Sequence, residues 1–459
     1  MKKFTFLPLF AFIFFAACKK DHISNPNTNI SNNTKETDTL TGTITADKTL
    51  DASKNYFLEG QVYVKNNATL TIPAGITVYA QVNSDASAKS ALIITQGSKI
   101  YINGTADKPV VFTSAAKNPA PGDWAAIILL GKAPTNTKTG IVEGFTAISD
   151  NMYGGNVPDD NSGSITYLRI EYTGGMNPPA EDEWVVDKAS GLVLASVGSG
   201  TRIDNVMVKY SNDDSFQFVG GTVNASHLIS YNCGDDDFDF DLGYEGDLQF
   251  LIGYRTQASS QALRANGVES YNDQYPTDNQ PYTRPVISNM TIIGPQGVQT
   301  VKTNLNQGVY IRKGTRFDIR NSIVAEYPEG ALMVCNKTRP ILLADTGSEF
   351  RYNLVQTDTT ARTFCWDKST AVVADPVLTT FATNTTNDDS ILVASGDFKL
   401  QDMYASGAPD LTPAGGSPAL SGAVFTGTDF SNAFFTQTTY RGAIGTMNWA
   451  AASNWANWK

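Results

Sequence analysis

The sequence predicts an all-β fold, a β-solenoid whose short strands stack as successive coils, and two observations support this prediction. Runs such as GSITYLRIEY (163–172) and PVISNMTIIG (285–294) alternate apolar and polar residues and are separated by Gly, Asn and Asp. The second observation is a repeat of about 22 residues, since similar runs end at Tyr210, Tyr231 and Tyr254. One coil of this size cannot bury its apolar face alone, so stacked coils share a continuous core.

Long stretches of the chain also resemble one family. They include LTGTITADKTLDASKNYFLEGQVYVKNNATLTIPAG (40–75), APGDWAAIILLGKAPTN (120–136) and TTYRGAIGTMNWAAASNWANW (438–458). These stretches resemble exported right-handed parallel β-helix proteins and lipoproteins common in Bacteroidetes. The resemblance covers nearly all of residues 40–459 and implies a right-handed parallel β-helix in an exported compartment. It implies no activity, because that family has no established biochemical activity.

We expect the β-helix to span residues 40–424, because residues 425–459 break the repeat. This last segment is rich in aromatic side chains: Phe425, Phe430, Phe434, Phe435, Trp449, Trp455 and Trp458. We interpret it as an aromatic C-terminal cap over the last coil, since an open ladder edge would pair with other chains. The alternative is an exposed aromatic platform that binds sugar.

Residues 1–17 are typical of a lipoprotein signal peptide. A basic start precedes about 14 apolar residues, too few to span a hydrocarbon core of about 30 Å as a helix. The small residues before Cys18 resemble the bacterial lipobox, although Phe15 stands where Leu is usual. This resemblance implies acylation of Cys18 and a lipid anchor in the outer membrane; an ordinary signal peptide with a chance Cys is the alternative. Residues 18–39, which are poor in large apolar side chains, are expected to be a flexible tether.

The charge of the chain limits its partners. A net charge of −11 disfavours nucleic acid and anionic lipid and favours cation binding. Lys19-Lys20-Asp21 loosely resembles the export signal of surface lipoproteins in Bacteroidetes, so we expect the cell surface rather than the periplasmic face. An exported compartment permits disulfides: either Cys335 pairs with Cys365 and leaves Cys233 free, or all three are buried thiols.

Two acidic stretches, NDDSFQF (212–218) and GDDDFDF (234–240), align at a shift of 22 residues. Alternation along a strand assigns their side chains to faces. The residues expected to face the core are Phe216, Phe218, Phe238 and Phe240. Those expected to face solvent are Gln217, Asp237, Asp239 and Asp241. Those expected in the turns before the strands are Asp213, Asp214, Asp235 and Asp236.

Carboxylates stacked about 5 Å apart repel one another, so they stay in solvent, share a proton or bind a cation. A structural Ca²⁺ is the first hypothesis, because Ca²⁺ takes six to eight oxygen ligands from neighbouring coils. Its expected ligands are Asp213, Asp235, Asp237, Asp239 and Asp241. The alternative without a ligand is a solvated acidic strand preceded by Asp-rich turns.

Two enzymatic alternatives remain open. Parallel β-helix polygalacturonases resemble this pattern in part, and paired carboxylates serve glycoside hydrolysis. The catalytic candidates are then Asp213, Asp214, Asp235 and Asp236, but the Gly-His of those enzymes does not follow. A uronate lyase would need Ca²⁺ and a basic residue; the basic residues near the acidic coils are Arg202, Lys209, Arg255 and Arg264.

Two inserts, 151–164 and 174–190, interrupt the coils shortly before the acidic stretches, and insertions in solenoids often form the binding face. We expect a ligand site where the inserts meet Asp213 and Asp235. The insert residues concerned are Asp159, Asp160, Glu181, Asp182, Glu183 and Trp184. These patterns favour a non-enzymatic outer-membrane lipoprotein that binds a polysaccharide or a cell-surface protein, with Ca²⁺ on the acidic coils. A polysaccharide-degrading β-helix enzyme is the alternative.

Overall fold

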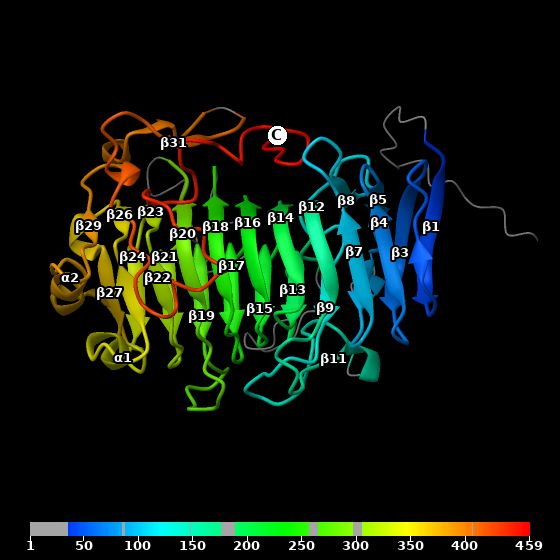
Figure 1. Ribbon diagram of the computed structural model, residues 1–459, viewed down its shortest axis with the longest axis horizontal. Coiled ribbons are helices and arrows are strands. Elements are labelled where there is room, and N and C mark those ends of the chain that lie inside the picture. The colour runs from blue at the N-terminus through cyan, green and yellow to red at the C-terminus, as the bar shows by residue number, and fades with distance from the viewer. Residues whose placement is uncertain are drawn as a thin grey trace, which may run out of the picture.

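The computed structural model describes residues 35–84, 88–146, 148–175, 189–256, 265–296, 305–405 and 407–459. Within them the chain forms a right-handed parallel β-helix, in which one sheet of 27 strands winds around a central core (Figure 1). The predicted fold class is confirmed. No helix in this described part has the length and apolar character needed to cross a membrane.

Three parallel ladders run along the β-helix. The site ladder, named for the acidic coils, consists of β6 (Ala91–Ile94), β9 (Ile127–Leu130), β13 (Leu192–Ala195), β15 (Phe216–Val219), β17 (Phe238–Asp241), β19 (Val268–Tyr271), β21 (Gln307–Arg312), β24 (Gly330–Cys335) and β27 (Phe364–Asp367). The strap ladder, named for the C-terminal segment on it, consists of β1 (Thr37–Ile44), β3 (Asn55–Val64), β5 (Thr77–Ala80), β8 (Val110–Ser114), β12 (Gly163–Glu171), β14 (Arg202–Lys209), β16 (Asn224–Tyr231), β18 (Asp247–Tyr254), β20 (Val286–Ile293), β23 (Ile323–Tyr327), β26 (Leu354–Thr357) and β29 (Ser390–Ile391).

The third ladder contains β2 (Lys48–Thr49), β4 (Thr69–Pro73), β7 (Lys99–Asn103), β22 (Asp318–Arg320), β25 (Glu349–Arg351) and the first halves of the long strands β12, β14, β16, β18 and β20. Each long strand bends into the strap ladder at one residue with positive φ, and these are Tyr167, Asn205, His227, Phe250 and Asn289. A left-handed residue redirects the chain sharply, so one strand serves two sides of the coil.

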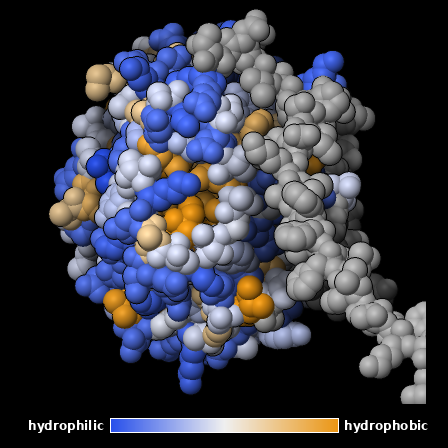
Figure 2. Space-filling view, turned by 90° about the vertical axis from the view of Figure 1, so that its right-hand side faces the viewer, coloured by the Kyte–Doolittle hydropathy of each residue, from blue (hydrophilic) through white to orange (hydrophobic). Residues whose placement is uncertain are grey.

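The remaining elements lie beside the ladders. They are β10 (Gly140–Ile141), β11 (Met152–Tyr153), β28 (Val372–Ala374), β30 (Leu400–Asp402), β31 (Asp410–Pro413), α1 (Arg339–Leu343), α2 (Pro376–Ala382) and short 3₁₀ segments. Figure 2 views the end that carries β1, where a small hydrophobic area is ringed by hydrophilic residues.

The core consists of stacked rungs, and the predicted inward Phe residues are among them. Phe216 pairs with Phe238 and Phe218 with Phe240, at the predicted shift. Their rings stack with centroids 5.3 Å and 5.0 Å apart, and all four side chains are fully buried. Stacked aromatic pairs stabilise by about 0.5–1.5 kcal/mol beyond their area, so these rungs fix the register of the acidic coils.

The C-terminal segment, Phe425–Lys459, is called the strap. It lies along the side of the β-helix and returns from the late coils towards β12 (Figure 1). Trp458 packs edge-on against Tyr231 and Tyr254, with centroids 5.4 Å and 5.9 Å apart. Farther back, Asn454 donates a hydrogen bond to the carbonyl of Asp107 at 2.8 Å.

The predicted aromatic cap is therefore wrong in its position. The strap covers apolar side chains that point outward from the strap ladder. Removing these side chains from water is favourable, just as it is at the end of the core. At the end of the core, Leu378 and Ala382 of α2 pack against the last rungs instead. Trp455 and Trp458 are buried, so they do not form an exposed sugar platform.

Candidate functional site

Two stacked turns, one before β15 and one before β17, carry the acidic residues. The backbone N–H of Gly234 donates to the carbonyl of Ser211 at 2.8 Å, and that of Ser215 donates to the carbonyl of Asp236 at 3.0 Å. The N–H of Asp236 also donates to Oδ1 of Asp214 at 2.9 Å. The repeat of the strands therefore extends into the turns, and it stacks carboxylates on carboxylates.

Three of these carboxylates form a cluster. Asp213, Asp214 and Asp235 each offer one oxygen, and the three oxygens lie within 4.8 Å of one another. Asp213 and Asp214 are buried, whereas Asp235 is half-buried. Burial, and then the charges of Asp213 and Asp235, raise the pKa of Asp214 well above its ordinary value. A donor set made only of carboxylate oxygens fits a hard cation such as Ca²⁺, Mg²⁺ or Mn²⁺.

The acids at alternate positions of β17 lie outside the core, as predicted, but they are not in solvent. Asp239 is 6% exposed and Asp241 is 1% exposed, and each has an oxygen without a hydrogen-bond partner within the described residues. The other oxygen of Asp241 accepts a hydrogen bond from the hydroxyl of Tyr271 at 2.8 Å. Burial and neighbouring carboxylates raise the pKa of both well above the ordinary range. The predicted solvated stripe is therefore wrong, and so is the prediction for Gln217, which is 6% exposed.

Asp237 faces the interior, contrary to the prediction. It precedes the first residue of β17, so the strand alternation does not yet apply to it. Its carboxylate is fully buried and accepts hydrogen bonds from Ser230 at 2.6 Å and Tyr327 at 3.3 Å, and it pairs with Arg255 at 3.3 Å. Because it lies on the core side of the turn, Asp237 cannot join the outer carboxylates in a cation site.

The buried guanidinium of Arg255 also holds the acidic turn. It donates to the carbonyl of Cys233 at 2.9 Å, to that of Asn266 at 3.0 Å and to that of Asp235. Charge-assisted hydrogen bonds of this kind are about twice as strong as neutral ones. Arg255 thus fixes the backbone beneath Asp235 and Asp236 and does not project into the outer site.

Cationic and aromatic side chains follow the carboxylates on the site ladder. Arg312 donates to both carboxylate oxygens of Glu269 at 3.1 Å, and its guanidinium lies over the ring of Tyr310 at 5.2 Å. Lys313 lies 5.0 Å from the ring centroid of Tyr271. Burial, and then the charge of Arg312, lower the pKa of Lys313. The outer face of this ladder therefore changes from acidic to basic within a few rungs.

The predicted insert residues do not meet the acidic cluster where the structure describes them. Asp160 lies against Gly198, in the turn after β13, and Asp159 lies close to Gly200 in the same turn. The carboxylate cluster lies at the opposite end of the site-ladder strands, where Ser190 donates to Asp214 at 3.2 Å. Because β13 separates the two groups, that prediction is wrong for Asp159 and Asp160. Residues 176–188, which include Glu181, Asp182, Glu183 and Trp184, lie outside the described residues, as does Cys18.

Lys209 and Arg202, two of the basic residues that the sequence suggested for a lyase, do not flank the cluster either. Lys209 pairs with Glu171 at 3.4 Å on the strap side, and Arg202 pairs with Asp204 at 2.9 Å on the third ladder. Arg264 lies outside the described residues. The thiols of Cys233, Cys335 and Cys365 are all free, so the disulfide alternative is wrong.

The sequence patterns did not identify five residues of this face as site residues: Glu269, Tyr271, Tyr310, Arg312 and Lys313. A usable signal was present, since GVYI (308–311) repeats the pattern of GLVL (191–194). Extending that register places Tyr310 in the same outward row as Val193. Asp239 and Glu269 lie between them in this row. The coils between these residues differ in length, so the sequence alone does not show that they share one row.

A family model described as a pectate-lyase-like beta-helix domain matches residues 42–395. The chain belongs to this family. The match includes both acidic turns and ends before the strap. No curated protein and no solved structure matches the chain. Because one fold can host many activities, membership supports the β-helix and leaves the function to be argued from the site.

Proposed function

We propose that this protein is a lipid-anchored protein of the outer membrane that binds a glycan along the site ladder. In this proposal Asp213, Asp214 and Asp235 hold a divalent cation such as Ca²⁺. The lipobox-like residues before Cys18 support the anchor, and Lys19-Lys20-Asp21 supports exposure at the cell surface. The observation that carries the proposal is the cluster of three carboxylates whose oxygens lie within 4.8 Å of one another.

Electrostatics support a cation at this place. The pKa of Asp214 and that of Asp236 are raised because burial and adjacent carboxylates disfavour the charged form. A second observation is independent of the cluster: Asp239, next along the face, is buried and has an oxygen without a hydrogen-bond partner within the described residues. A divalent cation would offset this repulsion and could also bridge to hydroxyl or carboxylate oxygens of a glycan.

The cation is tested by melting the purified full chain in Ca²⁺ and in EDTA. Ca²⁺ should raise the midpoint for the wild type but not for the double variant Asp213→Asn/Asp235→Asn, in which two of the three ligands are neutral. The matched control is Asp107→Asn, because Asp107 is exposed and far from the cluster in sequence. This variant should respond like the wild type. Equal midpoints of the wild type in Ca²⁺ and in EDTA would contradict the proposed cation site.

Glycan binding is tested with a panel of acidic and neutral polysaccharides, in Ca²⁺ and in EDTA. The proposal requires binding that weakens in EDTA and in the double variant; absence of binding to every member contradicts it. Labelling with radioactive fatty acid in cells, with Cys18→Ser as control, tests the anchor. Protease shaving of intact cells then distinguishes the cell surface from the periplasmic face.

A uronate lyase is the second candidate, and one observation favours it. Lys313 has a lowered pKa near the carboxylates, as a general base for β-elimination requires. The base would take the proton from the carbon next to the sugar carboxylate. A C=C bond would then form as the bond from the adjacent carbon to the glycosidic oxygen breaks, and the leaving oxygen would take up a proton from solvent. New absorbance from an unsaturated uronate, lost in Lys313→Met, would establish it. The cluster favours an inverting hydrolase less, because its oxygens lie closer than the roughly 6.5–9.5 Å typical of such enzymes.

A further inference from the structure

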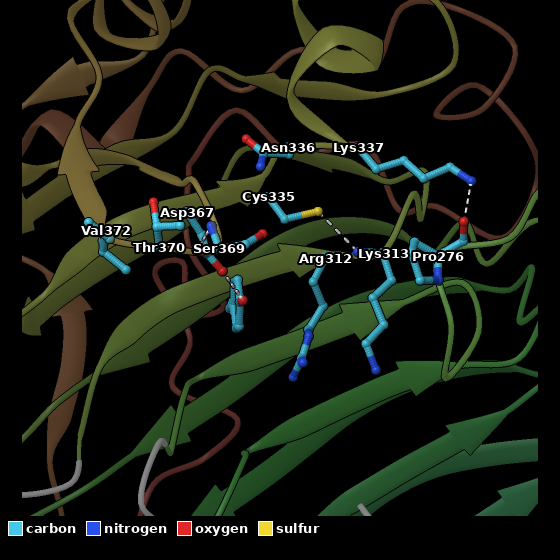
Figure 3. Close-up of a pocket in the computed structure, with 12 residues that line it drawn as sticks. Pro276, Arg312, Lys313, Cys335, Asn336, Lys337, Asp367, Ser369, Thr370 and Val372 are labelled. Atoms are coloured by element: carbon cyan, nitrogen blue, oxygen red, sulfur yellow. Dashed lines mark hydrogen bonds between the residues drawn. The ribbon is translucent and has the colours of Figure 1, made fainter.

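A pocket of about 450 Å³ lies on the outer face of β21, β24 and β27. Figure 3 shows Arg312 and Lys313 on one side of it and residues of the β27–β28 connection on the other. Tyr310 pairs with Glu269, which pairs with Asp239 on the preceding strand. The pocket therefore begins two rungs from Asp239, roughly 10 Å along the β-helix.

The charges that line the pocket are mainly positive, although the chain carries a net charge of −11. Arg312, Lys313 and Lys337 line it, against one carboxylate, that of Asp367. This carboxylate already accepts a hydrogen bond from the hydroxyl of Tyr310 at 2.6 Å and one from the backbone N–H of Ser369 at 2.8 Å. Both oxygens of Asp367 thus accept hydrogen bonds from within the protein. Cationic side chains outnumber this one carboxylate in the lining of the pocket.

The cations are held in place. Glu269 binds the guanidinium of Arg312 with both oxygens, and the guanidinium also lies over the ring of Tyr310. At the rim, Lys337 donates to the carbonyl of Pro276 at 2.7 Å (Figure 3) and pairs with Asp278 at 3.0 Å. Positive groups fixed beforehand lose little entropy when an anion binds. Hydroxyl groups of Ser369 and Thr370 on the opposite wall can bond to the polar remainder of a ligand.

We infer that this pocket binds an oxyanion, a carboxylate or a sulfate ester, carried by a sugar residue. The inference rests on the proposed glycan binding and names the class of glycan as acidic. A chain laid along the ladder would place one unit at the carboxylate cluster and an anionic unit between Arg312, Lys313 and Lys337. The cation cluster and the pocket are then two subsites of opposite charge on one face.

Three probes test this by isothermal titration calorimetry with the full chain. They are an oligosaccharide of uronic acids, the same compound with its carboxylates reduced to hydroxymethyl groups, and a sulfated neutral oligosaccharide. We expect tight binding only for an anionic probe, and the stronger of the two identifies the oxyanion. Lys313→Gln should weaken that binding about tenfold or more, because it removes a charged hydrogen-bond partner. Lys368→Gln is the matched control, since Lys368 lies over Trp366 outside the pocket lining.

Equal binding of the reduced probe, or equal loss in Lys313→Gln and Lys368→Gln, overturns the inference while glycan binding itself stands. If no oligosaccharide binds, the proposed function fails, and free uronate and sulfate ions then decide the inference. Binding of either ion that disappears in Lys313→Gln supports the anion pocket, and no binding of either ion overturns it. The melting midpoints of both variants, compared with the wild type, verify that each is folded.

Discussion

Two outer faces of the same coils have opposite chemistry. On the strap ladder, Met207, Ile229 and Ile252 stack in one row and are fully buried beneath the strap. On the site ladder, Asp239 and Glu269 stack in the corresponding outward row. The two rows share one β-helix and the same rung spacing. The side chains alone therefore distinguish the apolar row, which the strap covers, from the row of carboxylates.

In this solenoid one outer face contributes stability and another is available for binding. An apolar outward row gains free energy when a segment of the same chain covers it, at about 25 cal/mol per Å² of apolar area. A buried carboxylate among other carboxylates, such as Asp239, loses free energy unless a cation or a proton compensates it. We therefore interpret the acidic row as functional, since Asp239 does not stabilise the β-helix by itself.

The largest expected effect comes from the covered face. Trp458→Ala removes a buried ring that packs against Tyr231 and Tyr254 and donates from Nε1 to the carbonyl of Ala450 at 2.8 Å. We expect a loss of about 3–5 kcal/mol in the free energy of unfolding, measured with urea. Met447→Ala, at an 83% exposed position of the strap, should change it by less than about 0.5 kcal/mol. A loss below about 1 kcal/mol for Trp458→Ala would mean that the strap is only loosely held.

The opposite sign is expected on the acidic face. Asp239→Asn keeps the shape of the side chain and removes a buried carboxyl whose charged form is disfavoured by burial and by neighbouring carboxylates. The metal-free protein should become more stable by about 1–3 kcal/mol at neutral pH, because the amide needs neither a buried charge nor the uptake of a proton on folding. Urea unfolding in EDTA measures this change, with Asp107→Asn as the exposed control. Destabilisation by Asp239→Asn would show that the carboxylate is bound by a stabilising partner.

The sequence predicts which residues pair where the chain is periodic. It does not predict the orientation or position of residues outside the periodic strands. The register of Phe216 on Phe238 follows from alternation and the 22-residue shift, and the structure confirms it. Asp237 lies in a turn, where backbone direction and the buried Arg255 decide its orientation. The strap could not be placed because its contacts lie more than 200 residues away in sequence, as between Trp458 and Tyr231. Likewise, Arg312 reaches Glu269 across coils of unequal length.

The smallest expected effect concerns the pH dependence of the cation. In the metal-free folded state the pKa values of Asp214 and Asp236 are raised, so both carboxyls hold protons that the unfolded chain releases above about pH 4. The stability of the metal-free protein should therefore fall as the pH rises from about 4 through the folded pKa values. Ca²⁺ must displace these protons, so its affinity should increase over the same range. A fivefold gain in affinity corresponds to about 1 kcal/mol of added stabilisation.

Melting curves in Ca²⁺ and in EDTA at several pH values measure this dependence. The shift caused by Ca²⁺ should be larger at about pH 8 than at about pH 5. In Asp214→Asn/Asp236→Asn the EDTA curve should fall less with pH than that of the wild type, since two titrating carboxyls become amides while Asp239 and Asp241 remain. Asp213→Asn/Asp235→Asn removes two of the three proposed ligands and keeps both carboxyls with raised pKa values. Asp214→Asn/Asp236→Asn removes one proposed ligand together with both of these carboxyls. A Ca²⁺ shift that is equal at both pH values would mean that the cation binds elsewhere, and the acidic row would lose its role in the comparison with the strap face.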